Sequence, residues 1–215
     1  GRVAGRVTAS LGYGPITLFG DHGTASLTDA AFANATAGHG LDYDDVTWGV
    51  WHPSVPIVAP ILAVAERDRC SGRDVITAYV AGYETQVYLA SMLLPAHYER
   101  GWHATATFGT FGATAAVASL LGLDREQTRH ALNAAASMPA GLKRNFGTMT
   151  KPMHAGQAAR SGVTAGVLAA EGFTSAAGSI DGERGFCDLY SGDEAPALEE
   201  RPHLGESWEL VEGGI

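Results

Sequence analysis

Apolar residues recur every three or four positions through most of the chain, a spacing typical of amphipathic helices. Glycine, proline and polar residues interrupt this pattern and divide it into six predicted helices. Their approximate bounds are residues 30–38, 55–69, 75–94, 102–121, 125–137 and 152–170. The sequence contains no convincing pair of strands and no repeat of fixed period. The pattern therefore predicts an all-α fold.

Capping residues mark where several of these helices begin. Three pairs have the spacing of a capping box: Ser26 with Asp29, Ser71 with Asp74, and Asp124 with Gln127. Pro152 suits the first position of the last helix, and Gly172 is expected to end that helix. Many helical positions are Ala or Gly, which allow neighbouring helix axes to approach closely. Near the end of the chain, residues 208–211 are predicted to begin a strand.

The composition changes near residue 188. Residues 1–187 are expected to form one helical domain. Residues 188–207 are acidic and contain proline, which is typical of a loop, so residues 188–215 are assigned to a linker and the start of a further domain. The chain begins with Gly1 rather than Met and ends in Gly-Gly-Ile, so we expect it to be part of a longer protein.

Composition and charge exclude several classes of function. The chain is 46% hydrophobic and 17% charged, as expected of a globular protein. Its net charge of −9 argues against nucleic acid or an anionic membrane surface as a partner. No apolar run is long enough to span a membrane. Cys70 and Cys187 lie far apart without ligand-like neighbours, which favours two reduced thiols and a cytoplasmic location.

The densest group of ionisable residues lies between the first two predicted helices. It contains His39, Asp42, Asp44, Asp45 and His52, with Thr47, Trp48 and Trp51 among them. Clustered aspartates could instead cap the next helix and remain in water. The two neighbouring indoles favour a functional site, because solvated acidic loops rarely keep tryptophans beside them.

The same segment raises the question of a metal ion. His39, Asp42 and the neighbouring aspartates are groups that can bind a divalent cation. However, the i, i+2 spacing of Asp42 and Asp44 suits neither one helix face nor a calcium loop. No H-x-x-x-H or C-x-x-C pattern accompanies them. We therefore predict no metal and no cofactor, with a metal-dependent hydrolase as an alternative.

Two further candidate positions lie at helix starts. His103 stands at the N-terminal end of a very apolar helix, where the helix dipole favours a neutral imidazole that can accept a proton. Lys151 directly precedes the last predicted helix, whose free N–H groups attract anions, so it could bind a carboxylate. His154 follows one turn later. The alternatives are a histidine that caps its helix and an ordinary surface lysine.

Three segments of the chain resemble the MmgE/PrpD family: residues 33–54, 101–122 and 150–174. The run Lys-Pro-Met-His-Ala-Gly at 151–156 is the most specific part of the resemblance. Members of this family include 2-methylcitrate dehydratase, cis-aconitate decarboxylase and an iminodisuccinate epimerase. The resemblance implies a helical domain that pairs as a homodimer. It also implies first helices and a smaller α+β lid domain that this chain lacks.

The resemblance also implies site residues. The family's catalytic set falls on Asp42, His52, His103 and Lys151. We predict that the substrate is bound by His39, Asp45, Thr47, Lys151 and His154. A family threonine is replaced by Val46, next to Thr47, which puts one substrate hydrogen bond in doubt.

The chemistry implied is the formation of a carbanion next to a carboxylate of a small polycarboxylate. Lys151 would hold a substrate carboxylate, and His103 would act as the base or proton shuttle. Asp42 would orient His52 or itself exchange a proton with the substrate. We predict dehydration of a 2-methylcitrate-like hydroxy acid. Decarboxylation, epimerisation and a non-catalytic helical domain for binding or assembly are the alternatives.

Overall fold

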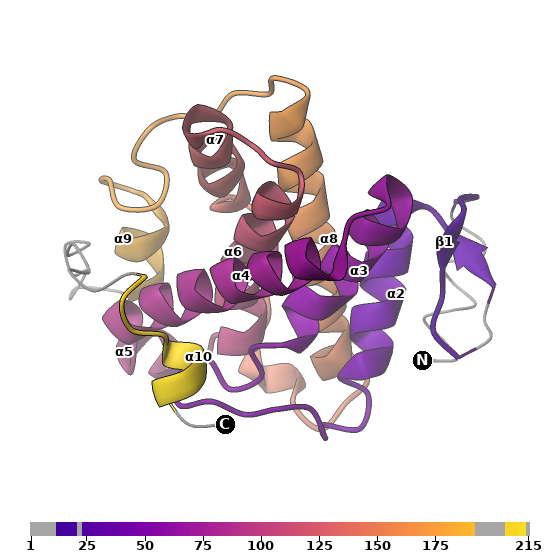
Figure 1. The fold of residues 1–215 in the computed structure, drawn as a ribbon. Coiled ribbons are helices and arrows are strands. Elements are labelled where there is room, and N and C mark those ends of the chain that lie inside the picture. Colours follow the sequence, from indigo (N-terminus) through magenta and orange to yellow (C-terminus); the bar gives the residue numbers. More distant parts are fainter. Residues whose placement is uncertain (1–11, 21–22, 192–204, 214–215) are drawn as a thin grey trace.

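The computed structural model describes residues 12–20, 23–191 and 205–213 (Figure 1). These residues form a bundle of helices with a two-stranded sheet at one side (Figure 1). The strands are β1 (Ile16–Thr17) and β2 (Thr24–Ala25). The long helices are α2 (Leu27–Gly38), α3 (Val55–Asp68), α4 (Gly72–Leu93), α6 (Ala104–Leu120), α7 (Arg125–Ala135) and α8 (Thr150–Ala170). The short ones are α5 (Ala96–Glu99), α9 (Phe186–Ser191), α10 (Glu209–Glu212) and the 3₁₀ turn η1 (Lys143–Asn145).

Helix α6 is the centre of the bundle. Every residue from 104 to 118 is buried, so this helix has no polar face and must be surrounded by other elements. It packs against α3, α4, α7 and α8, and α8 in turn packs against α2. The long, apolar helix therefore sets the position of its neighbours.

Glycines allow the helices of this core to touch through their backbones. A Cβ atom at Gly162 of α8 would lie 2.4 Å from the Cβ of Ala113 and 2.7 Å from its carbonyl carbon. A Cβ at Gly156 would lie 2.6 Å from the carbonyl oxygen of Phe32 in α2. The close approach predicted from the small residues is confirmed at these contacts.

The mostly helical fold and the predicted capping residues agree with the structure. The capping boxes led by Ser71 and Asp124 are both formed. The side chain of Ser26 accepts a hydrogen bond from the N–H of Asp29 at the start of α2. Cys70 and Cys187 are free thiols. The cytoplasmic location remains a prediction.

Several predicted elements are wrong. The strands β1 and β2 pair antiparallel, although no strand pair was expected, because two residues each are too few to show an alternating pattern. Residues 209–212 form a helix instead of a strand, and the N–H of Leu210 donates to Glu84 of α4. The short helices α5 and α9 were not predicted. Helix α8 begins two residues before Pro152.

The predicted domain boundary falls in a region that is described only in part. Residues 187 and 188 both belong to α9, so helix continues across the proposed boundary. Most of the acidic stretch 188–207 lies outside the described residues. The division into two domains remains a prediction. Among the described helices, none has both the length and the apolar character to cross a bilayer.

His97 of α5 is a fully buried imidazole that belongs to the fold. Its ring centroid lies 4.5 Å from that of Phe108, and its Nε2 atom is 2.9 Å from Oγ1 of Thr107. Its Nδ1 atom has no hydrogen-bond partner among the described residues. Burial lowers the pKa of His97 to about 3, because a charged imidazole would lose its hydration there.

We expect Gly162→Ala to destabilise the protein, because the added methyl group would overlap the backbone of α6. The free energy of unfolding in urea should fall by about 1–3 kcal/mol. Gly72→Ala is the control, because a Cβ at this helical position meets nothing within 4 Å and should raise stability by up to about 1 kcal/mol. Equal effects of the two substitutions would contradict the close contact.

His97 also predicts a dependence of stability on pH. Its pKa is near 6.5 in the unfolded chain and lower in the folded one, so the unfolded state takes up the proton first as the pH falls. This histidine alone should therefore lower the unfolding free energy by about 2 kcal/mol between pH 7.5 and pH 5. His97→Gln should show a correspondingly flatter profile in urea unfolding. An unchanged profile would mean that His97 is not held neutral.

Candidate active site

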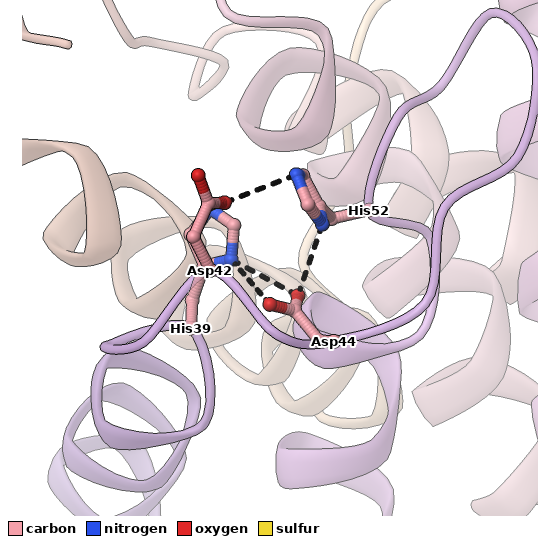
Figure 2. A group of neighbouring side chains, drawn as sticks. All are labelled: His39, Asp42, Asp44 and His52. Atoms are coloured by element: carbon pink, nitrogen blue, oxygen red, sulfur yellow. Dashed lines mark hydrogen bonds and ion pairs between the residues drawn. The ribbon is translucent and has the colours of Figure 1, made fainter. Parts of the chain in front are cut away.

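The candidate residues converge at one end of the bundle. The C-terminal end of α2, the loop from residue 39 to 54 and the N-terminal ends of α6 and α8 meet there (Figure 1). Four of their side chains form a cluster in which carboxylates and imidazoles alternate: His39, Asp42, Asp44 and His52 (Figure 2).

His39 ends α2 and turns its ring into the protein. It is the C-cap residue of the helix, and its side chain is completely buried. Its Nδ1 atom lies 3.0 Å and 2.9 Å from the two carboxylate oxygens of Asp44. The ring centroid of His39 is 4.6 Å from that of His52 in an edge-on arrangement. The contact with Asp44 therefore fixes the ring of His39, which lies against the ring of His52.

Asp42 links the loop to α8. Its backbone has φ of 55°, a left-handed conformation that is uncommon for a residue other than glycine. The ammonium group of Lys151 donates a hydrogen bond to Oδ1 of Asp42, and the same oxygen lies 3.2 Å from Nε2 of His52. The hydrogen bond from Lys151 holds the pKa of Asp42 below its ordinary value. Asp42 is thus a carboxylate at neutral pH.

The backbone around His52 is tied to the neighbouring helices. Thr47 and Trp51 exchange backbone hydrogen bonds of 2.9 Å and 3.1 Å, which close the loop just before His52. The N–H of His52 donates to Oγ1 of Thr105 in α6. Burial lowers the pKa of His52, and the nearby Asp44 carboxylate opposes this shift. The imidazole is therefore placed by backbone contacts and tuned by two carboxylates.

His103 and His154 form a second imidazole pair. His103 is the N-cap residue of α6, and its Nδ1 atom lies 3.1 Å from Nδ1 of His154. A hydrogen bond between these atoms requires that one nitrogen carries the proton and the other accepts it. Burial, with a smaller effect from His154, lowers the pKa of His103 to about 2. The neutral imidazole predicted at this position is consistent with that environment.

The loop before α8 is packed directly against this pair. Gly141 has φ of 138°, and a Cβ atom there would lie 3.3 Å from the Cβ of His103. Its carbonyl oxygen accepts the N–H of His103. Further along the loop, the ring of Phe146 stands edge-on to His103 at 4.9 Å, and the Lys151 nitrogen lies 5.4 Å from the same ring. Phe146 thus lies beside both groups.

Two of the predicted substrate-binding residues lie apart from the histidines. Asp45 accepts hydrogen bonds from the backbone N–H and the hydroxyl of Ser54, the residue before α3. Thr47 lines a cavity of about 740 Å³ together with Trp48 and Trp51, and the four histidines of the site are not part of its lining. The structure therefore does not bring Asp45 or Thr47 to the imidazole cluster.

Sequence reasoning left two residues out of the predicted site. Asp44 contacts both His39 and His52; the sequence placed it in the dense ionisable group but gave it no catalytic or substrate-binding role. The D-Y-D-D run lies between His39 and His52, so it could have indicated a carboxylate that contacts both histidines. Phe146 had no signal, because its position beside His103 depends on how the loop 141–149 folds back.

The four-residue cluster has the composition of a metal site. Each member offers a ligand atom, and these atoms lie within 4.8 Å of one another. Imidazole nitrogen and carboxylate oxygen suit first-row divalent cations. The ammonium group of Lys151, however, already contacts Oδ1 of Asp42, and its positive charge would repel a cation bound to that oxygen. Metal independence remains a prediction.

Comparison with known proteins places this arrangement in a family. Residues 2–199 match the MmgE/PrpD N-terminal domain. The chain belongs to the MmgE/PrpD family. It is 34% identical over 169 residues to human cis-aconitate decarboxylase, an alignment that covers 76% of this chain and 35% of the human protein. It is 33% identical to the mouse protein over 180 residues, with 80% and 37% covered. It is 30% identical over 198 residues to cis-aconitate decarboxylase of Aspergillus terreus, with 86% and 39% covered.

Both findings bear on the residues that the MmgE/PrpD resemblance named. The chain spans little more than a third of the length of these relatives. Within it, His52 and Lys151 both contact Asp42. His103 is adjacent, with its ring centroid 6.0 Å from that of His39. This MmgE/PrpD domain therefore brings all four positions to one end of the bundle.

We expect His103 to remain neutral across the range in which free histidine titrates. In a nuclear magnetic resonance titration from pH 8 to pH 5, its imidazole signals should not move, because burial has lowered its pKa to about 2. The urea-unfolded chain is the control and should titrate near pH 6.5. A midpoint near 6 for His103 in the folded protein would show that its ring reaches water.

Proposed function

We propose that the protein is a lyase that acts on a small polycarboxylate without a metal or an organic cofactor. The main observation behind this proposal is that Lys151 and His52 both contact Asp42, close to the neutral His103. An ammonium group can hold an anionic substrate, and imidazoles can move a proton. Membership of the MmgE/PrpD family supports a lyase of this class.

The net negative charge of the chain makes Lys151 important for binding an anionic substrate. This chain carries a net charge of −9, so binding of a polycarboxylate needs a local positive group. Lys151 is the second residue of α8, a helix whose first N–H groups also favour an anion. A substrate carboxylate placed there would share the ammonium group with Asp42. The same positive groups would stabilise negative charge that develops on the substrate.

The geometry supports different proton roles for the two catalytic histidines. Both ring nitrogens of His52 face carboxylates, Nε2 at 3.2 Å from Asp42 and Nδ1 at 3.5 Å from Asp44. The two carboxylates oppose the burial that lowers the pKa of His52, so a protonated His52 can form there and would be a ready donor. His103 stays neutral, and because burial makes it a weak base, it would accept a hydrogen bond or relay a proton rather than hold one. Asp42, already ionised, would orient His52 and not exchange protons itself.

The named relatives favour decarboxylation of cis-aconitate or a similar acid over the dehydration predicted from the sequence. In this reaction the bond to one carboxylate breaks, carbon dioxide leaves, and the electron pair enters an allylic carbanion. His52 would supply one proton to that carbanion and be reprotonated from water. Dehydration of a 2-methylcitrate-like acid requires the same groups and is tested in parallel.

The full-length gene product should release carbon dioxide from cis-aconitate, and Lys151→Ala should lower kcat/KM on the order of 100-fold or more. Arg144→Ala is the matched control, because this exposed cation lies in η1, in the loop before α8, and should leave the rate unchanged. Parallel assays with 2-methylcitrate and iminodisuccinate distinguish dehydratase and epimerase. Size-exclusion chromatography of the same sample tests the homodimer.

Two results would overturn this proposal. Loss of activity on treatment with a chelator, restored by a divalent cation, would indicate metal chemistry at the four-residue cluster. A folded gene product that converts none of the three substrates would support the non-catalytic alternative, a helical domain for binding or assembly.

A further inference from the structure

We propose that Asp44 is a positioning residue that determines which nitrogen of His39 carries the proton and orients His52 beside it. The role in catalysis rests on the proposed lyase function, whereas the effect on the two imidazoles does not. Asp44 belongs to the same short run as Asp42, yet it makes different contacts.

The three aspartates of the run have different sets of partners. Asp42 contacts Lys151 and His52, and Asp45 accepts the hydroxyl of Ser54 before α3. Asp44 points between the two imidazoles instead (Figure 2). Within the described part of the chain, its ion-pair partners are these two histidines, and its side chain is 13% exposed. Capping a helix, the ordinary role of such a residue, is therefore served by Asp45 and not by Asp44.

The contact with His39 fixes a tautomer. A carboxylate only accepts hydrogen bonds, so the short approach of 2.9 Å requires a proton on Nδ1 of His39. A neutral imidazole then has no proton on Nε2. This Nε2 atom is fully buried, lacks a hydrogen-bond partner among the described residues and faces Oδ1 of Asp42 at 4.0 Å. Asp44 thus leaves the unprotonated Nε2 atom of His39 directed toward Asp42.

The same carboxylate gives His52 its second partner. The Nε2 atom of His52 is close enough to Asp42 to donate its proton there. Its Nδ1 atom lies 3.5 Å from Asp44, without a hydrogen bond in this structure. A slight approach would let Asp44 accept a proton from Nδ1 whenever His52 carries two. Asp44 therefore holds His39 firmly and leaves His52 free to gain and lose a proton.

The alternative tautomer of His39 predicts what happens without Asp44. In Asp44→Ala, a proton on Nδ1 of His39 would be buried without an acceptor, which is unfavourable. The proton should move to Nε2, where Asp42 can accept it. In Asp44→Asn, the amide oxygen still accepts from Nδ1, so the original tautomer should be kept. Asp68→Asn is the control, because this exposed aspartate at the far end of α3 pairs with Arg67, and it should leave both imidazoles unchanged.

Nitrogen-15 spectra of the histidine rings, with His39 assigned from His39→Gln, test this directly. We expect a proton on Nδ1 of His39 in the wild type and Asp44→Asn, and on Nε2 in Asp44→Ala. In the full-length gene product, Asp44→Ala should lower kcat on the order of 100-fold with little change in KM, and Asp44→Asn should recover part of the loss. Asp68→Asn should retain full activity.

A wild-type His39 with its proton on Nε2 would overturn the inference, as would an Asp44→Ala variant with unchanged tautomer or unchanged kcat. If Asp44→Ala fails to fold, the ring spectra of the wild type and Asp44→Asn still show which nitrogen of His39 carries the proton. Absence of any lyase activity in the wild type would refute the proposed function, and the ring spectra would still decide whether Asp44 controls His39.

Discussion

Backbone contact between helices at glycine is the constraint on which the rest of the structure depends. Where α4 crosses α6, a Cβ atom at Gly82 would lie 2.5 Å from the carbonyl oxygen of Gly112. Gly162 brings α8 equally close to the other side of α6. Because α6 is buried all round, both neighbours are fixed relative to its start. The residues His103 and Lys151 lie at the N-terminal ends of α6 and α8, so the distances in the site follow from these contacts.

The site combines a neutral buried imidazole with a surrounding group of charged residues. The inner imidazole of His103 is kept neutral by burial. Around it, Asp42 and Asp44 each approach His52, and Lys151 compensates Asp42. Carboxylates beside imidazoles favour gain of a proton, whereas burial favours its loss. Such opposing effects keep proton transfer possible near neutral pH, and the ammonium group attracts the anion on which that proton would act.

The sequence predicted what depends on local pattern. Capping pairs located the starts of α4 and α7, and the family resemblance selected Asp42, His52, His103 and Lys151 before any geometry was known. Contacts between distant segments were not predictable. Asp45 contacts Ser54, whereas its neighbour Asp44 contacts the histidines, and the loop backbone determines this difference. The two-residue strands and the short helix α10 are stabilised by tertiary contacts, not by a pattern of their own.

The central claim is that this cluster forms and protonates a carbanion next to a carboxylate. Turnover of cis-aconitate by the full-length gene product in deuterium oxide, followed by mass spectrometry, tests that claim most directly. We expect release of carbon dioxide and one deuterium bound to carbon in the dicarboxylic product, both greatly reduced in His52→Gln. Conversion without deuterium on carbon, or an undiminished rate in His52→Gln, would contradict it.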